Sequence, residues 1–190
     1  MNQFNLSQIS GAISKVSGIE KDAASKVHTR LRELVRAKCV EPDEAVSQGK
    51  TALFSKTATM ALDLLAYYAG ISRNPGELKK MAAIFNPSPR PNANGIRVFD
   101  PLTADPVDVL NDSLRGEEWV LDIFIVESVK RPRQLEYRGG YRKRDEPPKF
   151  AVELFSASAE LREFRLIEQR TIYVSGRVRE LFGVLEGEAD

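Results

Sequence analysis

Residues 6–38 have the sequence LSQISGAISKVSGIEKDAASKVHTRLRELVRAK, and the fold of the first part of the chain depends on this stretch. In its first segment the apolar residues recur at helical spacing, at Leu6, Ile9, Ala12, Ile13 and Val16. In residues 20–38 they recur again, at Ala23, Ala24, Val27, Leu31, Leu34 and Val35. Gly18 lies between the segments, and a glycine readily ends a helix. The pattern predicts two amphipathic helices joined by a tight turn.

Two helices joined in this way are typical of a helix-turn-helix, in which the second helix enters the major groove of DNA. If the apolar side of residues 20–38 faces the core, the outward side chains are basic or small and polar. These are the types that contact bases and phosphates. We expect base contacts from Ser25, Lys26, Thr29 and Arg30, and phosphate contacts from Lys15, Arg32 and Arg36. The alternative is the solvated charged face of an ordinary surface helix.

The residues after the second helix have the character of a wing. Gln48, Lys50 and Thr51 flank Gly49, at the place where a winged helix-turn-helix contacts the DNA backbone or minor groove. We therefore count these three side chains as candidate DNA contacts. Apolar helices are predicted to follow at residues 57–68 and 76–85, the first ended by Gly70.

Several short motifs occur in order between residues 5 and 85: Leu6-Ser7-Gln8-Ile9, Ser17-Gly18-Ile19, Arg30-Leu31-Arg32-Glu33-Leu34-Val35, Val40-Glu41-Pro42, Gly49-Lys50, Phe54-Ser55 and Leu62–Gly70-Ile71. This order resembles the winged helix-turn-helix of MerR-like regulators, above all the bacterial variants associated with phages and prophages. The resemblance implies a DNA-binding transcription regulator. The chain departs from the family in two ways, since its wing has little basic character beyond Lys50 and Lys56 and no heptad stretch follows Phe85.

The second half of the chain has a different character. Residues 86–106 contain half of the ten prolines and are predicted to be a linker. Strands are expected at residues 119–129, 149–155 and 163–174, and helices at 107–114 and 175–185. The expected fold class is thus α+β, with an all-α winged helix-turn-helix domain at residues 1–85, a proline-rich linker at 86–106, and a small α+β domain for dimerisation or partner binding at 107–190.

Charge is distributed unevenly between the halves. Residues 1–90 contain 13 Lys and Arg against 8 Asp and Glu, whereas residues 91–190 contain 15 against 19. A basic first half suits contact with a polyanion. Residues 130–144 form a second basic segment, with seven basic residues and two tyrosines. It is either a nucleic-acid contact, since basic and aromatic residues alternate there, or a solvated hairpin loop with a glycine turn.

The residue types needed for other chemistry are scarce. His28 is the only histidine, so a histidine-based triad or a histidine-rich metal site is excluded. Cys39 is the only cysteine and is interpreted as a buried apolar residue in a reducing compartment. No signal peptide and no apolar run of about 20 residues is found. The sequence therefore predicts a cytoplasmic protein that is not an enzyme and has no metal, cofactor or membrane span.

Together these patterns predict a sequence-specific transcription regulator whose partner is double-stranded DNA, read with the helix at residues 20–38. Because one recognition helix rarely gives enough affinity, we expect a homodimer. Its interface is expected on the helices between Thr57 and Phe85 or on the apolar face of Ser175–Leu185. The C-terminal domain is a candidate site for a second protein partner. The alternative function is a protein-interaction or phage-associated structural module without specific DNA binding.

Overall fold

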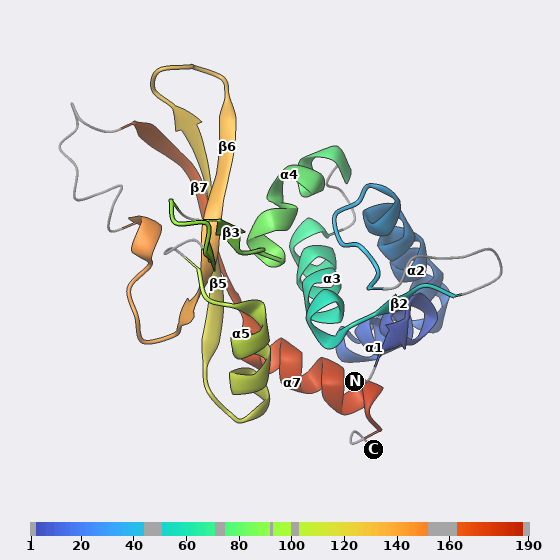
Figure 1. The fold of residues 1–190 in the computed structure, drawn as a ribbon. Coiled ribbons are helices and arrows are strands. Elements are labelled where there is room, and N and C mark those ends of the chain that lie inside the picture. Colours follow the sequence, from blue (N-terminus) through green and yellow to red (C-terminus); the bar gives the residue numbers. More distant parts are fainter. Residues whose placement is uncertain are drawn as a thin grey trace.

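The computed structural model describes residues 3–43, 51–70, 75–91, 93–99, 103–151 and 163–187. Helices dominate the first half of the chain, and a three-stranded antiparallel sheet forms most of the second half (Figure 1). This mixed architecture confirms the α+β class. The helix pair α1 and α2 lies on one side of the molecule and the sheet on the other, with α3 between them.

The N-terminal elements are β1 (Phe4–Asn5), α1 (Leu6–Val16), α2 (Lys21–Arg36), β2 (Leu53–Phe54), α3 (Lys56–Ala69) and α4 (Pro75–Phe85). The helices occur where the apolar spacing predicts them, with ends that differ by at most two residues. The part is not entirely helical, because β1 pairs antiparallel with β2. Two strands of two residues each are too short to produce a sequence signal.

Local sequence explains how α1 begins and ends. The Asn5 side chain accepts hydrogen bonds from the backbone of Ser7 and Gln8, and the Gln8 side chain accepts one from the Asn5 backbone. At the other end, Gly18 has a φ of +62°, and the Ile19 N–H donates to the Ser14 carbonyl over 2.9 Å. A glycine adopts this left-handed conformation without a steric penalty, so the chain can reverse within one residue.

The C-terminal elements are β3 (Arg90–Pro91), β4 (Arg97–Val98), α5 (Pro106–Leu114), β5 (Trp119–Ser128), β6 (Leu135–Lys143), β7 (Phe164–Tyr173) and α7 (Val174–Leu185). The sheet has the order β6-β5-β7, with both neighbours antiparallel to β5. Because β5 is the middle strand and is covered on both faces, its first eight residues are all buried. This explains why it has a nearly continuous apolar sequence instead of an alternating one.

Two sequence predictions in this half are wrong. For residues 130–144 the sequence offers a solvated hairpin loop with a glycine turn as one alternative, yet β6 occupies the centre of this segment and pairs with β5 along its whole length. Gly139 and Gly140 lie inside this strand and not in a turn. Residues 149–151 were expected to begin a strand but are helical, and the rest of that predicted strand lies outside the described residues.

One hydrophobic core joins the two halves. It extends from Phe4 and α1 through α3 and α4 to the inner face of the sheet and α7. The rings of Phe4 and Phe182 lie 6.0 Å apart, and α7 packs against α1 as well as α5. The apolar sides of α3, α4 and α7 are buried within this core. The faces expected to form a dimer interface are therefore covered by the chain itself.

The proline-rich stretch contains the short β3–β4 hairpin and is bonded to the sheet, since the Thr103 hydroxyl accepts a hydrogen bond of 3.0 Å from the Tyr141 backbone N–H. The boundaries at residues 85 and 106 stay predictions of the sequence. What the structure adds is that the halves on either side share their apolar interior.

Candidate nucleic-acid interface

The α1–α2 pair is held by apolar contacts and by a polar contact between Ser10 and His28. Ile9 and Ile13 of α1 and Leu31 and Leu34 of α2 belong to the common core. On the flank of the pair, His28 Nδ1 lies 3.2 Å from the Ser10 hydroxyl. The only histidine therefore faces α1. Four residues, Ser17 to Glu20, connect the helices.

The side of α2 that turns away from the core exposes most of the side chains singled out in the sequence. Exposed on this helix are Ser25, Lys26, Thr29, Arg32 and Arg36. Lys15, near the end of α1, is also exposed. The structure thus brings one candidate from α1 and five from α2 to the solvent-facing part of this helix pair. Glu33 is exposed on α2 as well, so the surface is not uniformly basic.

Arg30 differs from the other candidates. Its side chain is only 15% exposed, and its Nη1 donates to the Glu33 carboxylate over 3.1 Å. It lines the cleft between α2 and the end of α3, together with Ala66 and Tyr67. An arginine held in this way is less able to reach a base edge than an exposed one. Helical spacing alone does not distinguish Arg30 from Lys26. Which of the two side chains is covered depends on how distant helices pack against α2.

Two hydrogen bonds connect Asp43, which follows α2, to the region of β2. The Asp43 N–H donates to the Leu53 carbonyl over 3.1 Å, and the Asp43 carboxylate accepts a hydrogen bond from the Ser55 N–H. The two ends of the segment between them are therefore held together next to the β1–β2 pair. Of the three candidate wing contacts, Thr51 is exposed, whereas Gln48 and Lys50 lie outside the described residues.

A cleft of about 690 Å³ runs along the first half of α2. Four of the candidate side chains, Ser25, Lys26, Thr29 and Arg30, contribute to one wall. The opposite wall is the C-terminal end of α3, with Tyr67, and Arg177 from α7. No local pattern in the sequence indicates a functional role for Tyr67 or Arg177. Their one sequence signal is Asp63, an acidic residue inside an otherwise apolar helix, which predicts a buried cationic partner but does not say which one.

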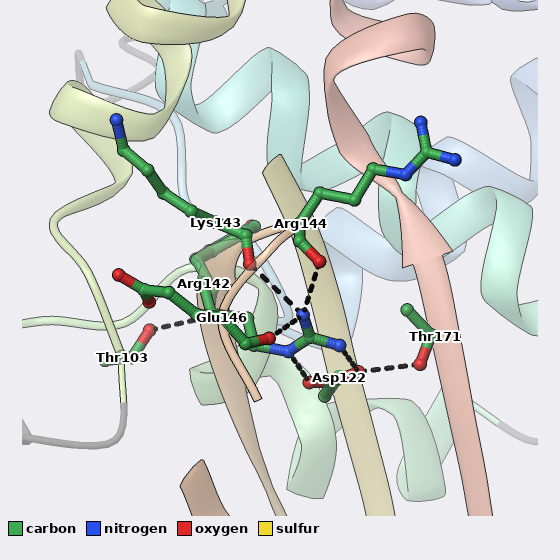
Figure 2. A network of polar contacts seen from close by, with 8 residues as sticks. Thr103, Asp122, Arg142, Lys143, Arg144, Glu146 and Thr171 are labelled. Atoms are coloured by element: carbon green, nitrogen blue, oxygen red, sulfur yellow. Dashed lines mark hydrogen bonds and ion pairs between the residues drawn. The ribbon is translucent and has the colours of Figure 1, made fainter. Parts of the chain in front are cut away.

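The second basic segment has a different environment. Arg142 donates through Nη2 to Asp122 Oδ1 over 3.3 Å, and its Nε lies 2.5 Å from Oδ2 (Figure 2). Its Nη1 donates to the backbone carbonyls of the turn that follows β6. Thr171 of β7 also donates to Asp122 over 2.6 Å, so this network connects all three strands of the sheet.

Tyr141, next to Arg142 in β6, is fully buried in the main core on the opposite face of the sheet. Its hydroxyl donates to the Phe85 carbonyl over 2.6 Å, at the end of α4, and burial raises the pKa of the phenol. A buried ring cannot stack on a nucleic-acid base. Lys130 and Lys143 form ion pairs with Glu163 and Glu117. Much of the basic charge of residues 130–144 is therefore paired within the protein, on β6 and at its two ends.

The structure gives little indication of other chemistry. Burial raises the pKa of the Cys39 thiol, which makes it a poor nucleophile. Within the described ranges, no cluster of three or more His, Cys, Asp or Glu residues has a geometry suited to a metal ion. In the same part of the chain, none of the helices is long and apolar enough to cross a bilayer.

Comparisons with known proteins leave the resemblance to MerR-like regulators as a prediction from the sequence. A scan against protein-family models and searches of curated proteins and of solved structures found no match to the chain. The assignment of a function to the α1–α2 surface therefore depends on its own geometry and chemistry.

Proposed function

We propose that the protein is a sequence-specific DNA-binding regulator that inserts α2 into the major groove. One observation carries the proposal: two packed helices, joined by a four-residue turn, present the exposed face of the second one at the edge of the molecule. The major groove is about 12 Å wide and accepts one such helix. In this arrangement α1 supports α2 and contacts the DNA backbone.

The exposed side chains divide into two groups by reach and chemistry. Ser25, Lys26 and Thr29 lie in the first half of α2, which is the part that contacts base edges in a helix-turn-helix. Arg32 and Arg36 lie further along α2 and suit phosphate contacts, as does Lys15 on α1. Glu33 on the same face would repel phosphates, so we expect a modest affinity for one copy and a homodimer on a two-fold site.

The hydrogen bond between Asp43 and Leu53 supports a winged form of the motif. It joins the chain after α2 to β2, which pairs with β1, and this follows the order of a winged helix-turn-helix. Thr51, Gln48 and Lys50 are the proposed wing contacts. The dimer and any second protein partner would use surfaces other than the buried sides of α3, α4 and α7.

The decisive experiment uses the full chain, because α1 packs against α7 and the core is shared. A pool of random duplex DNA is selected on the protein, and the enriched site is then titrated by fluorescence anisotropy at several salt concentrations. We expect one enriched sequence and an affinity that decreases as salt increases. If the affinity is independent of salt or no sequence is enriched, the proposal is wrong and a protein-interaction module is the better explanation.

Single substitutions on α2 distinguish the side chains that contact bases from those that contact phosphates. Lys26→Ala or Thr29→Ala is expected to cost about 1–3 kcal/mol at the specific site and to relax the sequence preference at one position. Arg36→Ala is expected to weaken binding to all sequences and to reduce the salt slope by about 1. Arg131→Ala, on the exposed turn after β5, is the matched control and should change neither quantity. Arg30→Ala is a poor test, because it also removes the ion pair with Glu33.

A further inference from the structure

The cleft along α2 has the size and lining of a site for a small molecule. Its volume of about 690 Å³ falls in the range of roughly 300–1,000 Å³ that is usual for ligand pockets. Its walls come from three regions that are distant in sequence: the α1–α2 pair, the end of α3, and α7. Apolar side chains contribute much of the surface, among them Ile13, Ile19 and Val27.

Arg177 and Tyr67 form the most structured part of this cleft. The Arg177 Nε and Nη2 donate to the two carboxylate oxygens of Asp63 over 2.9 and 2.6 Å. The guanidinium carbon lies 4.1 Å from the centre of the Tyr67 ring. Asp63 is almost completely buried, and its burial raises the pKa of the carboxyl while Arg177 lowers it. The paired carboxylate and the ring thus fix the guanidinium in one position.

The fixed guanidinium retains donors for a ligand. Nη1 has no hydrogen-bond partner within the described part of the chain, since both bonds to Asp63 use the other two nitrogens. Tyr67 is 57% exposed, which is unusual for a large aromatic side chain on a helix whose other residues are mostly buried. Lys26 adds an exposed cation on the opposite wall. The remaining Nη1 donor of Arg177, the Lys26 ammonium and the exposed part of the Tyr67 ring suit a ligand that combines an aromatic group with an anionic one.

We infer that this cleft binds a small aromatic anion. The apolar part of the ligand lies against Tyr67 and Val27, and its anionic group pairs with Arg177 and Lys26. Glu20 and Glu33 also line the cleft, but Glu33 is paired with Arg30. Arg177 is likewise paired, with Asp63, but its Nη1 and the Lys26 ammonium remain as cationic donors, and Glu20 is the acidic side chain of the lining that opposes them. An anionic group therefore meets two cationic donors against one carboxylate, whereas a cationic ligand would be repelled by Arg177 and Lys26.

The inference also gives the proposed DNA-binding surface a form of regulation, and this part rests on the proposed function. Ser25, Lys26 and Thr29 belong to both the cleft wall and the proposed base-contacting surface. A ligand that engages Lys26 removes it from DNA, so the anion and DNA should weaken each other's binding. By thermodynamic linkage, the factor by which the anion lowers the affinity for DNA equals the factor by which DNA lowers the affinity for the anion.

The first test measures ligand binding without DNA. The probe is 8-anilinonaphthalene-1-sulfonate, an aromatic anion that becomes fluorescent in apolar sites, titrated against the full-length folded chain. We expect saturation at one probe per chain. The uncharged analogue N-phenyl-1-naphthylamine should bind about tenfold more weakly, which corresponds to the loss of one charge-assisted hydrogen bond. Equal binding of the two probes, or several weak sites, would overturn the proposal.

Substitutions of cleft residues test whether the sulfonate probe binds in the cleft. Tyr67→Ala and Lys26→Ala should each weaken binding of the sulfonate probe about fivefold or more, and Lys26→Ala should leave the neutral analogue unaffected. Matched controls are Ile167→Ala, another half-exposed apolar residue, and Lys80→Ala, another exposed lysine outside the cleft. Arg177→Lys keeps a cation for Asp63 but loses the planar fork, so it tests Arg177 with the least risk to folding. Unchanged probe binding in all three cleft variants would refute the site.

The second test adds the DNA site identified by selection. A saturating concentration of the sulfonate probe should weaken DNA binding, and DNA should weaken probe binding by the same factor. If probe and DNA bind independently, the regulation is refuted while the site stands. If DNA is not bound at all, the proposed function fails, and the result of the probe titration alone decides the cleft.

Discussion

The two basic segments of this chain look alike in sequence and differ in structure. In α2, Lys26, Arg32 and Arg36 lie exposed on one face. In β6, Arg142 is only 11% exposed, and its guanidinium is bonded to Asp122 and to three backbone carbonyls. The comparison of α2 with β6 shows that the number of basic residues in a segment does not by itself indicate a nucleic-acid contact. What matters is whether the charges are already paired within the fold.

The largest expected effect tests the structural role of β6. Arg142→Met should lower the free energy of unfolding by about 3–5 kcal/mol, because it leaves the buried Asp122 carboxylate without its cation. Urea denaturation measures this loss. Arg131→Met, which changes an exposed arginine near the same hairpin, should stay within about 0.5 kcal/mol of the unmodified protein. Equal effects of the two variants would contradict the difference between paired and exposed charges.

A smaller effect is expected from Tyr141, which precedes Arg142 in β6 and lies on the opposite face of the sheet. Tyr141→Phe keeps the buried ring but leaves the Phe85 carbonyl without its hydrogen bond of 2.6 Å. An unsatisfied buried acceptor costs about 1–3 kcal/mol, so the midpoint of urea unfolding should decrease while the m-value stays the same. Tyr67→Phe serves as the control, because Tyr67 is exposed. If stability is unaffected by Tyr141→Phe, the link between β6 and α4 is weaker than the structure indicates.

A change at the end of α2 should have the opposite sign. Lys38 adopts a φ of +56°, in the same position after α2 that Gly18 occupies after α1. Lys38→Gly removes the steric penalty of this conformation and should raise the free energy of unfolding by about 0.5–1 kcal/mol, after the entropy of the more flexible unfolded chain is subtracted. Thermal unfolding measures the gain. Gly18→Lys is the reciprocal variant and should be less stable than the unmodified protein.

The smallest effect concerns the exposed basic residues near the β5–β6 turn. If the basic character of this segment has no role in DNA binding, Arg131→Ala should leave both the unfolding free energy and the salt slope of DNA binding unchanged, whereas Arg36→Ala should reduce the slope by about 1. Anisotropy titrations at several salt concentrations compare the two. A reduced slope in Arg131→Ala would show that both basic segments contact DNA.

The sequence predicted the elements with a strong local signal. Leu6–Val16 and the following helix have regular apolar spacing and a glycine between them, so their existence and the turn at Gly18 follow from local rules. The strand at 119–128 is apolar enough to be identified in the same way. In contrast, β6 was missed because its glycines and charges look like a turn. Gly139 is needed there, since a Cβ at this position would lie 2.1 Å from the Asp122 carbonyl oxygen.

The sequence by itself determined the α+β class, the positions of the main helices and most of the exposed set on α2, because hydrophobic periodicity indicates which side of each element is buried. Only the tertiary structure decided which charges are available. Arg30 turns toward α3 and pairs with Glu33, and Arg177 reaches Asp63 across 114 positions of sequence. Such pairs depend on how distant elements pack, and no local pattern records that. For the same reason, the cleft between α2, α3 and α7 exists only once the chain has folded.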